Sequence, residues 1–64
     1  MVGETNSIRV NGEHRRVENG LTIQQLVADQ LGFAKAMVER NAEPVTDLGQ
    51  CVADGDDYEI FEQL

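Results

Sequence analysis

The residues best suited to chemistry in this sequence are few and far apart. The chain has one cysteine, Cys51, and one histidine, His14, which by themselves cannot complete a metal site that needs three or four ligands. The run at residues 54–57 ("DGDD") resembles the start of a calcium loop, but no acidic residue follows at the spacing of the bidentate ligand. No phosphate-binding glycine loop and no Ser/His/Asp grouping is present. The sequence therefore predicts no enzyme, no metal site and no cofactor.

The two reactive side chains have ordinary structural explanations. We expect His14 to lie on an exposed edge strand, and Cys51 to be a small buried hydrophobic residue, as free cysteines usually are. A single reduced thiol is also typical of the cytoplasm. Residues 1–7 ("MVGETNS") lack the apolar segment of a signal peptide, and no apolar run reaches the roughly 20 residues that span a membrane. These features indicate a cytoplasmic protein with no membrane partner.

The length of 64 residues predicts a single domain over residues 1–64, with a flexible N-terminus at residues 1–6. A chain of this size buries only about 60% of the surface of its unfolded state. It is too small to enclose a ligand pocket of several hundred Å³. Its function is therefore expected on its surface.

The net charge of −7 lies entirely in the C-terminal part of the chain. Residues 1–40 hold five acidic and five basic residues, whereas residues 41–64 hold seven acidic residues and no basic one. Phosphate backbones would be repelled by that half, which argues against a nucleic-acid partner. Two interpretations stay open: a solvated surface that keeps the protein soluble, or an acidic face that attracts a basic partner.

The N-terminal elements are marked by a turn signal. Asn11 and Gly12 separate two strand-like runs, and this dipeptide is typical of hairpin turns in which both positions need positive φ. The second run, residues 13–18 ("EHRRVE"), offers only Val17 to a core. That composition is typical of an edge strand, where charge discourages pairing with other chains.

The segment at residues 21–33 ("LTIQQLVADQLGF") predicts the single helix. Thr22 and Gln25 have the spacing of a capping box. Gly32 is placed to end the helix in the left-handed conformation. Apolar residues recur at helical spacing and define one buried stripe: Ile23, Leu26, Val27 and Leu31.

Three further strands are expected at residues 34–41, 43–45 and 57–64, with a turn at Asn41-Ala42. The order is then strand, strand, helix, strand, short strand, strand. It predicts an α+β fold of the β-grasp (ubiquitin-like) type, with a mixed sheet of four to five strands and one amphipathic helix across one face.

A candidate partner-binding surface follows from the alternation of side chains along two strands. Glu59 and Phe61 are expected on the open face of the sheet, away from the helix, and the same parity sends Met37 and Glu39 outward. If these strands are neighbours, an apolar spot lies between acidic side chains. Single exposed apolar residues are common on any surface, but an apolar spot with a polar rim is typical of a docking surface. Leu64, at the end of the last strand, completes the predicted set.

Three stretches together resemble a known family. They are residues 8–13 ("IRVNGE"), 37–45 ("MVERNAEPV") and 54–61 ("DGDDYEIF"). In this order they are similar to the ubiquitin-like sulfur-carrier proteins of the ThiS/MoaD type, most closely the thiamine-biosynthesis (ThiS) branch. The resemblance runs over essentially the whole chain from Ser7 to Leu64.

The resemblance implies a mechanism and two partners. Members of the family end in a flexible Gly-Gly tail, whose terminal carboxylate is adenylated by an E1-like activating enzyme. A sulfur donor then converts the carboxylate to a thiocarboxylate, and in the thiamine branch the carrier delivers that sulfur to thiazole synthase. Two glycines suit such a tail because they let an extended chain pass through a narrow active site.

Two features depart from the family pattern. Ala42 stands where the family usually has glycine, which is acceptable if that turn needs no positive φ. No Gly-Gly occurs in the sequence, and Leu64 falls about where the tail of the family begins. We therefore expect a sulfur carrier whose tail is missing from this sequence. The alternative is a tail-less binding or regulatory module such as the TGS domain of threonyl-tRNA synthetases and some GTPases, without sulfur transfer.

Overall fold

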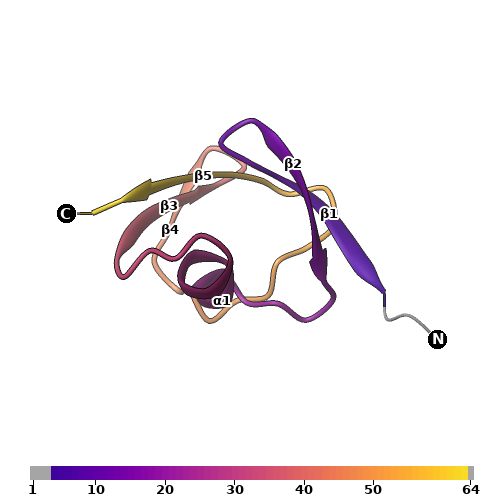
Figure 1. Ribbon diagram of the computed structural model, residues 1–64. Helices are drawn as coiled ribbons and strands as arrows, with labels where there is room; N and C mark the ends of the chain where they lie inside the picture. Colours follow the sequence, from indigo (N-terminus) through magenta and orange to yellow (C-terminus); the bar gives the residue numbers. More distant parts are fainter. Residues whose placement is uncertain (1–3, 64) are drawn as a thin grey trace.

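Five strands form one mixed sheet, and a short helix packs against one of its faces (Figure 1). The computed structural model describes residues 4–63. The elements in chain order are β1 (Thr5–Val10), β2 (Glu13–Glu18), α1 (Ile23–Gln25), η1 (Leu26–Gln30), β3 (Ala36–Arg40), β4 (Glu43–Val45) and β5 (Asp57–Glu62). The strands lie in the order β2-β1-β5-β3-β4, with β1 and β5 parallel and the other neighbours antiparallel. The prediction of a β-grasp fold is confirmed.

The core lies between the sheet and the helix. Alternate residues of the central strands face it, so that Ile8, Tyr58 and Ile60 are each no more than 2% exposed. On the edge strand β2 only Val17 is fully buried, as predicted, and His14 is exposed. The remaining buried side chains come from both layers: Val10, Ile23, Leu26, Val27, Val38 and Val52.

The helix begins as predicted but continues with a wider turn. The Thr22 hydroxyl accepts a hydrogen bond from the Gln25 backbone N–H, and the Gln25 side chain accepts one from the Thr22 N–H, which completes the capping box. In η1 the hydrogen bonds span five residues instead of four, so the Leu31 N–H donates to the Leu26 carbonyl at 3.1 Å. Gly32, at a φ of 74°, ends the helix in the left-handed region as expected.

The two hairpin turns have the same backbone conformation. Asn11 and Gly12 have φ values of 51° and 84°, and Asn41 and Ala42 have φ values of 51° and 69°. Positive φ at both positions matches the twist of the flanking strands. Ala42 was expected to be acceptable only if its turn needs no positive φ, and this condition is not met. The alanine therefore adopts a left-handed conformation with a steric cost that glycine would avoid.

Two other sequence predictions need correction. Cys51 is exposed rather than buried, because it forms an isolated bridge with Thr22 and alternation turns the next residue, Val52, into the core instead. The flexible N-terminus predicted at residues 1–6 extends two residues too far, because β1 begins at Thr5, which pairs with Glu18. Residues 1–3 lie outside the described residues. No helix within residues 4–63 has the length and apolar character needed to cross a membrane.

Replacing Ala42 with glycine should stabilise the protein. A left-handed conformation costs an L-residue about 1–2 kcal/mol, and the extra freedom of glycine in the unfolded chain takes back about 0.5–1 kcal/mol. We expect Ala42→Gly to raise the free energy of unfolding by about 0.5–1 kcal/mol, measured by urea denaturation.

The matched control is Gly12→Ala at the equivalent position of the other hairpin. A Cβ there meets no atom within 4 Å, so its cost is purely conformational and, by the same two terms, should lower the free energy of unfolding by about 0.5–1 kcal/mol. A destabilised Ala42→Gly variant, or a neutral Gly12→Ala variant, would contradict the assigned turn conformations.

Candidate docking surface

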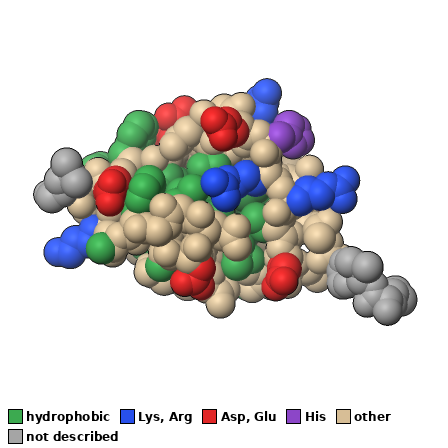
Figure 2. Space-filling model, in the orientation of Figure 1, with side chains coloured by type: hydrophobic (Ala, Val, Ile, Leu, Met, Phe, Trp, Pro, Cys, Tyr) green, Lys and Arg blue, Asp and Glu red, His purple; other side chains and the backbone are tan. Residues whose placement is uncertain are grey.

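Two large apolar side chains lie exposed on the open sheet face, near the C-terminal end of β5. Met37 of β3 and Phe61 of β5 are direct cross-strand partners, and they are 60% and 53% exposed. Figure 2 shows exposed hydrophobic side chains between acidic ones at the upper left of the view, over these strands. Alternation explains their position, because their neighbours Val38 and Ile60 are in the core. The predicted pair is thus brought together.

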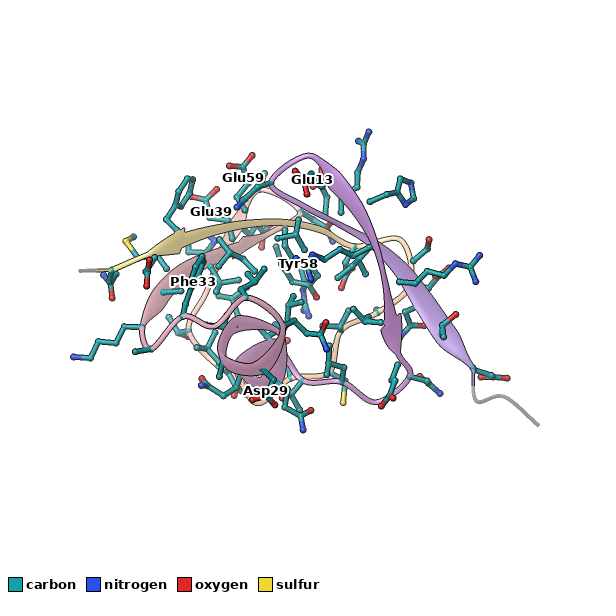
Figure 3. The ribbon with its side chains drawn as sticks, viewed as in Figure 1. Glu13, Asp29, Phe33, Glu39, Tyr58 and Glu59 are labelled. Carbon is teal, nitrogen blue, oxygen red and sulfur yellow. The ribbon has the colours of Figure 1, made fainter. Side chains whose placement is uncertain are left out.

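Two glutamates lie beside this apolar pair. Glu39 and Glu59 face each other across β3 and β5, two residue pairs further along the ladder and therefore on the same face. In Figure 3 both point away from the helix, whereas Tyr58 points into the space between helix and sheet. Like charges directly opposite each other destabilise a sheet. The repulsion between Glu39 and Glu59 therefore lowers the stability of the unbound protein. A cationic group placed between the two carboxylates would remove that repulsion.

The other half of the open face carries basic side chains. Arg9 of β1 lies opposite His14 of β2, and Arg16 lies opposite Ser7. Arg9 is also the cross-strand partner of Asp57, where the two halves meet. The open face is thus divided between an acidic, apolar half on β3 and β5 and a basic half on β1 and β2.

Two asparagine side chains hold β5 in place from opposite sides. The Asn11 amide nitrogen donates to the Ile60 carbonyl at 3.0 Å, and its Oδ1 accepts from the Ile60 N–H at 2.9 Å. The Asn41 Oδ1 accepts from the Asp57 N–H at 3.0 Å, and the Asn41 N–H donates to the Asp57 carbonyl at 2.8 Å. Each hairpin turn therefore extends the hydrogen-bond ladder of β5 through a side chain.

The acidic turn before β5 is an acceptor site for hydrogen bonds within the chain. Asp54 Oδ1 accepts from the Ser7 N–H at 2.7 Å. Asp56 Oδ2 accepts from the Ala53 N–H at 3.1 Å and from the Tyr58 hydroxyl at 2.7 Å. The carboxylates at residues 54 and 56 therefore stabilise the turn.

These contacts change two pKa values. Burial by itself would raise the pKa of Asp56, but neighbouring groups outweigh it and hold the pKa below its ordinary value of 3.8: the Tyr58 hydroxyl, the Ala53 N–H, the Asn41 side chain and the Arg40 charge. Burial, followed by the hydrogen bond to Asp56, raises the pKa of Tyr58 to about 12.

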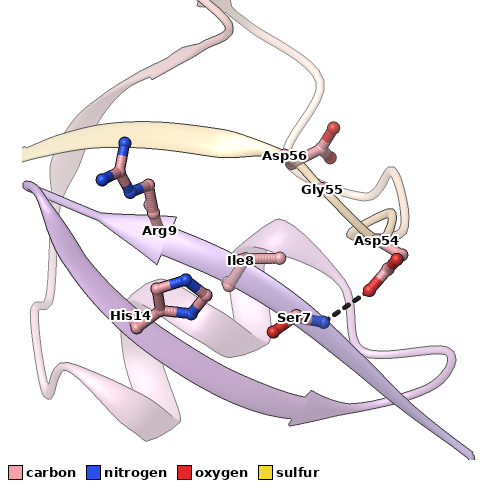
Figure 4. A pocket seen from close by; sticks show the side chains of 7 residues that line it. All are labelled: Ser7, Ile8, Arg9, His14, Asp54, Gly55 and Asp56. Carbon is pink, nitrogen blue, oxygen red and sulfur yellow. Dashed lines mark hydrogen bonds between the residues drawn. The ribbon is translucent and has the colours of Figure 1, made fainter.

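A shallow hollow lies between the β1–β2 hairpin and the acidic turn (Figure 4). Its volume is about 190 Å³, below the range of small-molecule sites. Arg9 and His14 line it from one side, and Asp54 and Asp56 from the other. Within residues 4–63 no three histidine, cysteine or acidic side chains group to hold a metal ion. The hollow therefore gives no support for a bound cofactor.

Four of the five residues predicted for partner binding lie together on the open face: Met37, Glu39, Glu59 and Phe61. The fifth, Leu64, lies outside the described residues. The sequence marked Asn11 and Asn41 only as turn formers and did not indicate that their side chains hold β5. Both turns read Asn, small residue, Glu ("NGE" and "NAE"), and this repetition indicates two equivalent turns but not the strand that the asparagine side chains bind.

The support from known proteins comes from a solved structure. No family model matches the sequence, and neither does any curated protein. The chain is similar to the crystal structure of a thiamine biosynthesis protein (ThiS) from Geobacter metallireducens, with a TM-score of 0.69 and 26% sequence identity. The similarity covers 91% of this chain and 94% of that chain. The resemblance to the ThiS-like sulfur carriers is confirmed at the level of the fold, and this fold is that of a small carrier protein rather than an enzyme.

The pair Asp56–Tyr58 predicts how stability depends on pH. Because the folded pKa of Asp56 is lowered from 3.8, its contribution is complete above that pH and is lost as the pH falls through the lower folded value. The folded pKa of Tyr58 is raised from 10.0 to about 12, so its contribution is complete below pH 10 and is lost as the pH rises toward 12. Urea denaturation across pH should show both losses.

Tyr58→Phe is the control for both pH effects. It removes the titrating hydroxyl and one donor to Asp56, so the alkaline loss should disappear and the acid loss should shrink. The comparison uses the slope of stability against pH, which a uniform loss of stability does not change. Unaltered slopes in this variant would contradict the assigned interaction.

Proposed function

We propose that this chain is the body of a ubiquitin-like sulfur carrier that serves the biosynthesis of the thiazole ring of thiamine. The observation that supports it best is the similarity to a ThiS structure over nearly the full length of both chains. The proposal takes residues 1–64 as one domain that works in the cytoplasm, and it requires the natural chain to continue beyond Leu64 to a Gly-Gly end.

The chemistry of such a carrier takes place at its terminal carboxylate. An E1-like activating enzyme joins the carboxylate to the AMP part of ATP and releases pyrophosphate. A sulfur donor then displaces AMP, which leaves a thiocarboxylate for thiazole synthase to accept. The folded body needs no catalytic side chain for these steps. Its part is to bind each enzyme and to present the chain that follows β5, a strand held at Asp57 and Ile60 by the Asn41 and Asn11 side chains.

The open face supplies the binding energy in this proposal. Met37 and Phe61 provide the apolar centre of an interface, where truncation of an anchoring side chain typically costs most. Glu39 and Glu59 form its acidic rim. A partner surface with an apolar depression and a basic side chain between these glutamates would relieve their mutual repulsion.

The decisive experiment begins with the gene beyond the codon for Leu64. The natural chain, including whatever follows Leu64, is purified and incubated with a ThiS-activating enzyme and ATP. A C-terminal acyl-adenylate, detected by intact mass spectrometry, is the expected result. A reading frame that stops at Leu64, or an extended chain that forms no adenylate, contradicts the carrier function. Either outcome favours the tail-less binding module instead.

Phe61→Asp tests the docking surface in the same assay. It should weaken association with the activating enzyme about tenfold or more, because it places a third negative charge in the apolar centre, while helix content measured by circular dichroism stays unchanged. His14→Asp is the matched control, since it adds a negative charge to the same face on the far edge strand and should bind as the wild type. Equal binding by both variants would show that the docking surface lies elsewhere.

A further inference from the structure

The side chains of the turn residues Asn11 and Asn41 both bind β5, but different residues follow them. Gly12 follows the first asparagine and Ala42 the second. The chain has another Asn-Gly pair, Asn19-Gly20, at the exposed turn between β2 and the helix. The same dipeptide thus occurs once with its side-chain amide bound to β5 and once in an exposed turn.

An Asn-Gly pair can undergo a spontaneous reaction without any enzyme. The backbone nitrogen of the glycine attacks the side-chain carbonyl carbon of the asparagine, a five-membered succinimide ring forms, and the amide nitrogen leaves as ammonia. Water then opens the ring and yields aspartate or isoaspartate. Glycine favours the reaction because no Cβ hinders its nitrogen and its backbone is freely mobile, whereas alanine at the same position slows it.

We propose that Asn11 is a deamidation site that the folded state protects and that unfolding exposes. Both polar atoms of its amide are hydrogen-bonded to Ile60, at 3.0 and 2.9 Å. The Asn11 N–H also donates to the Tyr58 carbonyl at 2.9 Å. The side-chain carbonyl carbon of Asn11 reaches the Gly12 backbone nitrogen only after the side-chain amide has broken its hydrogen bonds to Ile60. The reaction therefore proceeds from an opened hairpin.

Deamidation at Asn11 removes the contact that protected it. A carboxylate has no N–H to donate to the Ile60 carbonyl and would instead place a negative charge against that oxygen. Isoaspartate also lengthens the main chain within a two-residue turn. The aspartate product therefore loses the hydrogen bond to the Ile60 carbonyl, and a chain that has been unfolded long enough to react carries a covalent change that destabilises the refolded state.

The first test compares deamidation rates at three asparagines of the wild-type chain. Folded and urea-unfolded protein is incubated at mildly alkaline pH, digested, and analysed by mass spectrometry for Asn11, Asn19 and Asn41. In the unfolded chain Asn11 and Asn19 should react at similar rates, and Asn41, which precedes alanine, should react more slowly. In the folded chain Asn11 should react about tenfold or more slowly than Asn19, because its hydrogen bonds must break first. Equal folded-state rates at Asn11 and Asn19 would overturn the proposal.

The second test measures what the product does to stability. Asn11→Asp mimics one product at the attached turn, and Asn19→Asp adds the same charge at the exposed turn. We expect Asn11→Asp to lower the melting temperature by about 5–15 °C and Asn19→Asp to change it little. If Asn11→Asp does not fold, the rates in the wild-type chain still decide the proposal. Equal melting temperatures of the two variants would contradict the predicted consequence.

Discussion

The structure depends on how its last strand is held. β5 is central in the sheet, yet its register with β1 consists of only two residue pairs, Arg9–Asp57 and Val10–Tyr58. Beyond that point the Asn11 side chain takes the place of a strand backbone, because it both donates to Ile60 and accepts from it. On the other side the Asn41 side chain accepts from the Asp57 N–H, while the Asn41 backbone N–H donates to the Asp57 carbonyl. Since a buried backbone group without a partner costs about as much as a lost hydrogen bond, these two side chains hold β5 in register where its ladder with β1 ends, beside the five residue pairs that it forms with β3.

The surface chemistry follows from that placement. With β5 held between β1 and β3, alternation buries Tyr58 and Ile60 and turns Glu59 and Phe61 outward. The acidic charge of the C-terminal part is then used in two ways. Asp54 and Asp56 accept hydrogen bonds within the turn that leads into β5, whereas the glutamates of the open face lie against each other. The first group stabilises the fold, and the second leaves an unrelieved repulsion on the surface proposed for docking.

The sequence predicted the fold wherever a feature depends on local pattern. Alternation placed Met37 and Phe61 outward, Asn11-Gly12 marked the first hairpin, and Thr22 with Gln25 marked the start of the helix. Two of the failures come from long-range contacts, and one comes from turn geometry. Cys51 is exposed because of a bridge to Thr22, far away in the chain, and the positive φ of Ala42 is imposed by a hairpin that must match strand twist. The attachment of Asn11 to Ile60 joins residues 49 positions apart, and no local signal carries such a pairing.

Native-state hydrogen exchange tests most directly whether the two amides hold β5. The N–H groups of Ile60 and Asp57, whose acceptors are the Asn11 and Asn41 side chains, should exchange as slowly as the backbone-paired amides of the β3–β5 ladder. Asn11→Gly keeps the turn conformation but removes the acceptor, so it should speed exchange at Ile60 more than at Asp57, and Asn41→Gly should do the reverse. Exchange of both amides in the wild type at the rate of an unstructured peptide would contradict the account.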